Sequence, residues 1–186
     1  DTLRIREFIV NATKKLSVVV VGGGYIGVEM AENLKEAGCD VTIVELSDHL
    51  IAPLDDDMAA EVHNYIDEMG VKLVLKNGVS SIEDTGDGLV VQLQKGSLKA
   101  DMLMMAVGVR PDSELAKAAG LELGARGCIA VDRSMRTSDP DSYAVGDAVE
   151  VIDFMSGKPA FIPLAGPANK QGRIAADNIF GLKSEY

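Results

Sequence analysis

The spacing of three glycines near the start of the chain is the sequence feature that most clearly indicates a binding site. Gly22, Gly24 and Gly27 follow directly on a run of β-branched residues, Val18–Val21. In this G-x-G-x-x-G spacing the first glycine permits a tight turn, the second lets the backbone approach a pyrophosphate, and the third lets a helix pack closely on the strand. A helix that begins here directs unpaired N–H groups and its positive end toward phosphate. The spacing therefore predicts a binding turn for a dinucleotide.

An acidic residue, Glu45, ends the next apolar run. Its separation from Gly27 is close to the roughly 20 residues expected for the carboxylate that hydrogen-bonds the adenosine ribose. A carboxylate there repels a 2′-phosphate, and neither Arg nor Lys occurs between Gly38 and Lys72. We therefore expect the cofactor to be NAD(P)H, with NADH favoured over NADPH.

Two further side chains lie just beyond the glycines. Tyr25 and Glu29 are four residues apart, so on the predicted helix they share one face. The pattern alone leaves two readings open. The pair flanks a pocket, or it is exposed and has no role.

The periodicity of the apolar residues places this turn inside an α/β fold. Strands and helices alternate over the first 75 residues, which is the order of a Rossmann-type parallel sheet. Short strands at 79–82, 89–93 and 98–100, punctuated by Asn-Gly and Asp-Gly pairs, predict a β-meander that forms a crossover of that sheet. We expect the other strands at 17–21, 40–45, 71–75, 102–107, 128–131 and 142–145, and helices within 1–15 and at 25–37, 55–69, 113–119 and 167–180.

Apolar stripes predict which helix faces are buried. The helix within 1–15 is expected to pack onto the domain that follows it. For the next two helices, the residues expected to face the sheet are Ile26, Met30, Leu34 and Ala37 in the first and Met58, Val62, Ile66 and Met69 in the second.

Composition excludes several classes of function. The 186 residues include 18 Lys and Arg against 29 Asp and Glu, a formal net charge of -11, and so acidic a surface makes a nucleic-acid partner unexpected. No apolar run approaches the roughly 20 residues that span a bilayer, and no secretory leader is recognisable, so we expect no membrane partner. Cys39 and Cys128 form no C-x-x-C pair, so we expect reduced thiols, a cytoplasmic location and no metal site. The sequence opens on Asp1 rather than Met, so we expect a processed chain or a piece of a longer protein.

Four segments together carry a family resemblance. Residues 19–29 resemble the NAD(P)H-binding motif of the FAD-dependent pyridine nucleotide-disulfide oxidoreductases, 106–111 resemble that family's G-x-R-P segment, and 143–148 resemble its second FAD-binding motif. The stretch 163–172 is most similar to the branch that holds coenzyme A-disulfide reductases, NADH oxidases and NADH peroxidases. The segments occur in the family's order and spacing over nearly the whole chain.

The resemblance implies roles at the nicotinamide end of the cofactor. Gly22, Gly24 and Gly27 would hold the pyrophosphate and Glu45 the ribose, as the spacing already predicts. By resemblance, Tyr25 would lie over the flavin and move aside for nicotinamide. The nicotinamide pocket would be formed by Ile26, Glu29 and Gly108.

The resemblance also implies an FAD-binding segment. Gly146 and Asp147 would lie at the ribityl chain of FAD, with the Asp147 carboxylate accepting a hydrogen bond. The helix near Pro167, entered through Ala165, would direct its positive end at the flavin. We therefore expect an NAD(P)H-binding domain at 1–140 and a returning segment of the FAD-binding domain at 141–186.

The sequence departs from the family at its ends and in its cysteines. The family's first FAD-binding turn, its redox cysteine and its C-terminal dimerisation domain have no match, and neither Cys39 nor Cys128 lies at the redox position. The resemblance implies a homodimeric full-length enzyme that passes hydride from NADH to FAD and on to a disulfide, peroxide or oxygen. We expect this chain alone to be inactive. Two alternatives stay open: an NAD-binding regulatory module without catalysis, and a reductase of the ferredoxin or rubredoxin type.

Overall fold

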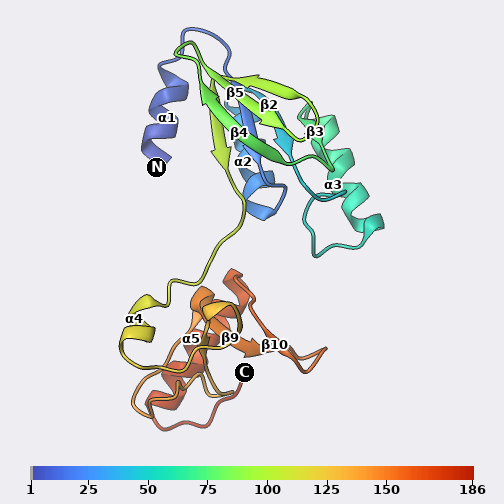
Figure 1. Ribbon diagram of the computed structural model, residues 1–186. Helices are drawn as coiled ribbons and strands as arrows, with labels where there is room; N and C mark the ends of the chain where they lie inside the picture. The colour runs from blue at the N-terminus through green and yellow to red at the C-terminus, as the bar shows by residue number, and fades with distance from the viewer. Residues whose placement is uncertain (1) are drawn as a thin grey trace. The chain divides into compact units, whose positions relative to one another are not determined.

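The computed structural model describes residues 2–186 and divides into two compact units that meet in the sequence between Gly108 and Val109. The units are described separately below (Figure 1). Their boundary falls earlier in the chain than residue 140, where the motifs place the end of the NAD(P)H-binding domain. That functional boundary stays a prediction.

A parallel four-stranded sheet forms the centre of the first unit. Its strands are β1 (Ser17–Val21), β2 (Asp40–Val44), β3 (Lys72–Val74) and β7 (Met102–Met105), in the order β3-β2-β1-β7. Every neighbouring pair is parallel, which confirms the Rossmann-type sheet. Runs of valine and isoleucine suit these strands because both faces of the sheet are covered.

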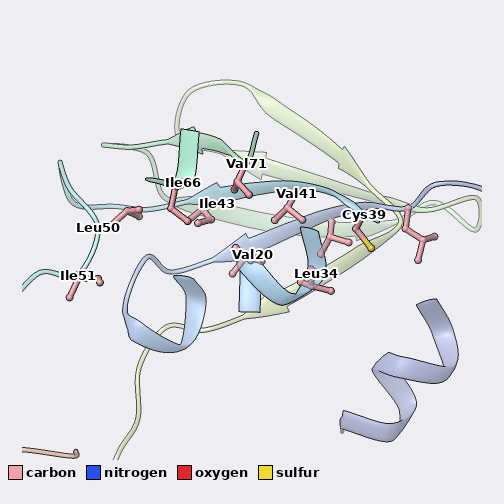
Figure 2. Close-up of a cluster of buried hydrophobic side chains, with 12 residues drawn as sticks. Val20, Leu34, Cys39, Val41, Ile43, Leu50, Ile51, Ile66 and Val71 are labelled. Carbon is pink, nitrogen blue, oxygen red and sulfur yellow. The ribbon is translucent and has the colours of Figure 1, made fainter. Parts of the chain in front are cut away.

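Two helices, α2 (Tyr25–Glu36) and α3 (Asp56–Glu68), contribute to the core on one face of this sheet. Figure 2 shows that core, which includes Val20, Ile43, Leu34 and Ile66. The expected stripe of α2 was wrong at its first and last residues. Ile26 is 54% exposed and Ala37, the C-cap, is also exposed, whereas the helix buries Gly27, Ala31 and the expected Leu34. The small residues Gly27 and Ala31 let α2 approach the sheet closely, which turns Ile26 outward.

The stripe of α3 was likewise wrong at its start. Met58 is exposed, whereas its neighbour Ala59 and the expected Ile66 are buried. The helix begins at Asp56, with Asp55 as its N-cap. Val62 and Met69 of the expected stripe are partly buried against the same core.

An antiparallel meander supplies the core on the other face. It consists of β4 (Val79–Asp84), β5 (Leu89–Leu93) and β6 (Ser97–Ala100) in sequential order, as expected. Val19 and Val21 of β1 pack toward the meander, because alternate residues of a strand point to opposite faces. The unit therefore has three layers, with helices, parallel sheet and meander in that order.

The first helix, α1 (Thr2–Val10), is shorter than the expected 1–15 and contains no fully buried residue. Ile9 and the following Ala12 are partly buried against the core of Figure 2, while Leu3 and Val10 are exposed. The expected packing onto the domain is therefore limited to the end of this segment.

The second unit contains α4 (Glu114–Ala118) and a small sheet of β8 (Ile129–Ala130), β9 (Val149–Ile152) and β10 (Pro159–Ala160), with α5 (Ala165–Ile179) contributing to the same core. Two short 3-10 turns, η1 (Ala125–Gly127) and η2 (Gly146–Ala148), complete it.

The strand expected at 142–145 was wrong. In that segment Tyr143 forms one isolated bridge with Arg136, and the residues that pair with β8 are Val149 and Glu150 of β9. Met135, next to Arg136, adopts a left-handed φ of 65°, which is not the extended backbone of a paired strand. No helix within residues 2–186 has the length and apolar character needed to cross a bilayer.

Candidate functional site

The predicted binding residues of the first unit gather at the carboxyl ends of β1 and β2. The loop Gly22–Gly24 joins β1 to α2, and Glu45 directly follows β2. Ligands of open α/β sheets bind outside this edge, where the loops leave the sheet. The topology therefore brings the glycine turn and the acid together, although they are separated in sequence by the whole of α2.

Gly22 and Gly27 make the turn compact. Gly22 has a left-handed φ of 103°, and a Cβ there would overlap the carbonyl of Ala106 at the end of β7. A Cβ on Gly27 would overlap the carbonyl oxygen of Gly22 itself. Both neighbours are backbone atoms, so neither position accommodates a side chain without displacing α2 or β7.

Gly24 differs, because it faces open space. It is the N-cap of α2, it is exposed, and a Cβ there would have no heavy atom within 4 Å. No side chain caps the helix at this residue. The first N–H groups of an α-helix lack partners within the helix, so this end of α2 can donate hydrogen bonds to an anion.

Glu45 is anchored by two backbone amides. Its Oε2 accepts from Gly23 N at 2.6 Å and its Oε1 accepts from Ser47 N at 2.7 Å. Partial burial acts to raise the pKa of Glu45, but the hydrogen bonds from Ser47 and Gly23 outweigh it and lower the pKa below its ordinary value. The group is therefore a carboxylate at neutral pH. Each oxygen keeps a free lone pair, so both ribose hydroxyls could still donate to it.

Gly23 was missed by the sequence reasoning. Besides donating to Glu45, it accepts at its carbonyl from Ile51 N at 2.8 Å, and a Cβ there would overlap the Leu50 side chain. It therefore ties the turn to Glu45 and to the loop after β2. The uninterrupted run of three glycines was visible in the sequence, but the G-x-G-x-x-G spacing assigns a role only to the first and third of them.

The residues expected at the nicotinamide end are accessible in this structure. Tyr25, Ile26 and Glu29 lie exposed on the first turns of α2. Gly108 has a left-handed φ of 102° and open space at its Cβ position. Their roles toward nicotinamide stay predictions.

The residues expected at FAD lie in the second unit. Asp147 is exposed on η2, and Ala165 is the first residue of α5, whose N-cap, Leu164, makes no side-chain cap. Gly146 N donates to Oε1 of Gln171 at 2.8 Å, and Gln171 is only 1% exposed. This buried glutamine joins η2 to α5. The sequence reasoning missed it, although a polar residue between the apolar positions of α5 was a visible signal.

The two cysteines are buried free thiols. Burial raises the pKa of both, with further increases from Asp40 for Cys39 and from Glu150 for Cys128. Such thiols stay protonated at neutral pH and are poor nucleophiles. Within residues 2–186, no three His, Cys, Asp or Glu side chains cluster in a way that could hold a metal ion.

Comparisons with known proteins agree with this geometry. A family model described as pyridine nucleotide-disulphide oxidoreductase matches residues 1–172. An NADH oxidase of Methanocaldococcus jannaschii is 41% identical over 177 residues, which are 95% of this chain and 39% of that protein. A CoA-dependent NAD(P)H sulfur oxidoreductase of Pyrococcus abyssi is 34% identical over 186 residues, 100% of this chain and 42% of that protein.

Among solved structures, reduced Bacillus anthracis CoADR-RHD superposes with a TM-score of 0.92 at 48% identity. That match covers 100% of this chain and 33% of the Bacillus chain. The chain thus spans about two fifths of the length of the curated relatives named above.

Proposed function

Because the chain belongs to the pyridine nucleotide-disulphide oxidoreductase family, we propose that it is the NAD(P)H-binding part of a flavin-dependent oxidoreductase. The observation that carries this is the joining of Glu45 to the glycine turn through Gly23 N at 2.6 Å, beside the uncapped start of α2. One edge of the sheet then offers N–H donors to a pyrophosphate and a carboxylate to a ribose. NADH is favoured, because the ribose position carries a negative charge.

The open geometry around these residues supports the proposal. Gly24 leaves the space above the helix start open, and the carboxylate of Glu45 has acceptor capacity beyond its two amide partners. The bound nicotinamide supplies a hydride for a flavin. The chain contributes binding and orientation through Gly24, Glu45 and the first turn of α2.

We propose that FAD is held in part by the second unit. Exposed Asp147 on η2 and the open start of α5 at Ala165 are the groups that would meet it. Residues 141–186 would then be one flank of an FAD site, and other segments of a protein of the relatives' length would form the rest. In a longer protein of the relatives' length, the acceptor would be a disulfide resembling coenzyme A disulfide, a peroxide or oxygen. The relatives named above include an NADH oxidase and a CoA-dependent sulfur oxidoreductase.

The assembly and location are part of the same proposal. The full-length enzyme would be a homodimer in the cytoplasm, where two buried free thiols remain reduced. The isolated chain would bind nucleotide but turn nothing over, because Cys39 and Cys128 are buried and protonated.

Calorimetric titration of the chain with NADH tests the proposal. We expect saturable binding that weakens when Glu45 is replaced by Gln. A chain that binds no NADH at millimolar concentration contradicts the proposal. A protein extended to the relatives' length should also retain FAD on purification, and its absence would favour the regulatory module instead.

A further inference from the structure

The turn after β3 brings a lysine to the predicted adenosine end of the site. Lys76 N donates to the Ser47 carbonyl at 2.9 Å, and Asn77 N donates to the Glu45 carbonyl at 3.1 Å. These bonds continue the parallel pairing of β2 and β3 past the strand ends. Lys76 therefore lies beside the turn that carries Glu45, although the sequence separates them by all of α3 and β3.

Asn77 fixes the backbone that carries this lysine. The Asn77 side chain is buried, and it donates to the Lys95 carbonyl and accepts from Lys95 N, both at 3.0 Å. Lys76 itself adopts a left-handed φ of 51°, which this bonded turn maintains. Hydrogen bonds on both sides thus set the position of Lys76 relative to Glu45.

The charged end of Lys76 is paired with an acid from the same loop. Its Nζ lies 3.7 Å from Oδ2 of Asp48, and the two side chains are 71% and 60% exposed. An ion pair this long and this exposed is weak, because water screens both charges. A phosphate monoester carries about -1.5 to -2 charges at neutral pH, so it competes well with one carboxylate for such a cation.

We propose that Asp48 and Lys76 determine the choice between NADH and NADPH, an inference that rests on the proposed function. Lys76 is the cation that a 2′-phosphate on the adenosine ribose would contact. Asp48 neutralises that cation and, together with Glu45, repels the phosphate. Removing the charge of Asp48 therefore releases Lys76 and shifts the preference toward NADPH.

The test compares adenosine 2′,5′-bisphosphate with ADP, and NADPH with NADH, by calorimetric titration of the whole chain. The first pair of probes reports on the adenosine end alone. Variants are Asp48→Asn, Lys76→Met and the double substitution. The controls Asp67→Asn and Lys72→Met change the net charge equally. Asp67, at the end of α3, and Lys72, the first residue of β3, lie near the amino ends of the parallel strands and so at the opposite edge of the sheet from the site.

We expect Asp48→Asn to shift the ratio of affinities toward the 2′-phosphorylated ligand by about twofold to fivefold, the upper part of the range for one exposed charge contact. Adding Lys76→Met should cancel that shift. The inference is overturned if Asp67→Asn has the same effect, or if the shift survives the loss of Lys76. Binding of NADH and ADP without any shift refutes only this inference, whereas a chain that binds none of the four ligands refutes the proposed function as well.

Discussion

Replacing Glu45 by Gln tests both the amide bonds that the structure shows for this carboxylate and the ribose contact proposed for it. The amide keeps one oxygen, so one of the two backbone N–H groups retains its acceptor. The other N–H then faces an NH₂ group, which is itself a donor. Because the substitution preserves size, its effect reports hydrogen bonding and charge rather than packing.

The magnitude follows from the bonds that change. A hydrogen bond to a charged group contributes about 1.5–3 kcal/mol, and water partly replaces it at this half-buried position. We therefore expect Glu45→Gln to lower the free energy of unfolding of the first unit by about 1–2 kcal/mol. Loss of one ribose acceptor should weaken NADH binding by about tenfold.

Acid should produce the same loss in the unaltered chain. The pKa of Glu45 is lower in the folded than in the unfolded protein, so its stabilising contribution is present above the ordinary value of 4.5. That contribution disappears as the pH falls through the lower folded pKa. The Gln variant should lack this part of the pH dependence.

The assays are urea unfolding between pH 3 and pH 7 and NADH titration at pH 7. Glu61→Gln, which makes the same chemical change at an exposed carboxylate within α3, is the matched control. If Glu45→Gln left both stability and NADH affinity at the level of this control, the role assigned to the two amide bonds would be refuted.

Three further predictions concern other parts of the fold. Gly27→Ala should destabilise the first unit by at least about 2 kcal/mol, because the added Cβ would overlap the Gly22 carbonyl. Gly172→Ala, in open space on α5, should instead stabilise the second unit by about 0.5–1 kcal/mol. Urea midpoints equal to that of the unaltered chain would contradict these two expectations. The Lys14 ammonium and the Ser17 amide lower the pKa of Asp101 to about 2, so its carboxylate stabilises the folded chain, and that stability is lost as pH falls from 3.8 toward 2. Asp101→Asn should lack this contribution at neutral pH, and a pH titration followed by NMR checks the pKa of Asp101. Gln171→Leu leaves Gly146 N without its acceptor and should cost about 1–3 kcal/mol in the second unit, measured by hydrogen exchange near η2; unchanged exchange there would show that the bond is dispensable.

Much of the fold could be predicted because its signals are local. The strand Ser17–Val21, the glycine turn and the helix from Tyr25 follow one another without interruption, and each is specified by residues within it. The meander was predicted for the same reason, since Gly86 and Gly96 adopt left-handed backbone that tight turns require. Family membership also followed from short contiguous segments.

The predictions that were wrong depended on partners distant in sequence. Ile26 has the hydrophobicity of a core residue, but the approach of α2 to the sheet through Gly27 turned it outward. The segment at Tyr143 has a strand-like composition, yet it forms one isolated bridge, to Arg136 beside the left-handed Met135, and β9 is the strand that pairs with β8. The type of a residue indicates which environment it favours, and packing against residues distant in sequence decides whether it is buried and with what it pairs.

The sequence by itself determined the α/β order, the glycine turn and the position of the acid at the end of the next strand, because those depend on spacing along one βαβ unit. Only the tertiary structure placed Lys76 beside Asp48 and Gln171 beneath Gly146. Each contact joins two segments that the sequence separates by whole helices or strands. Their geometry exists only after parallel strands align their carboxyl ends and a helix packs across its sheet, which is why no local pattern could reveal them.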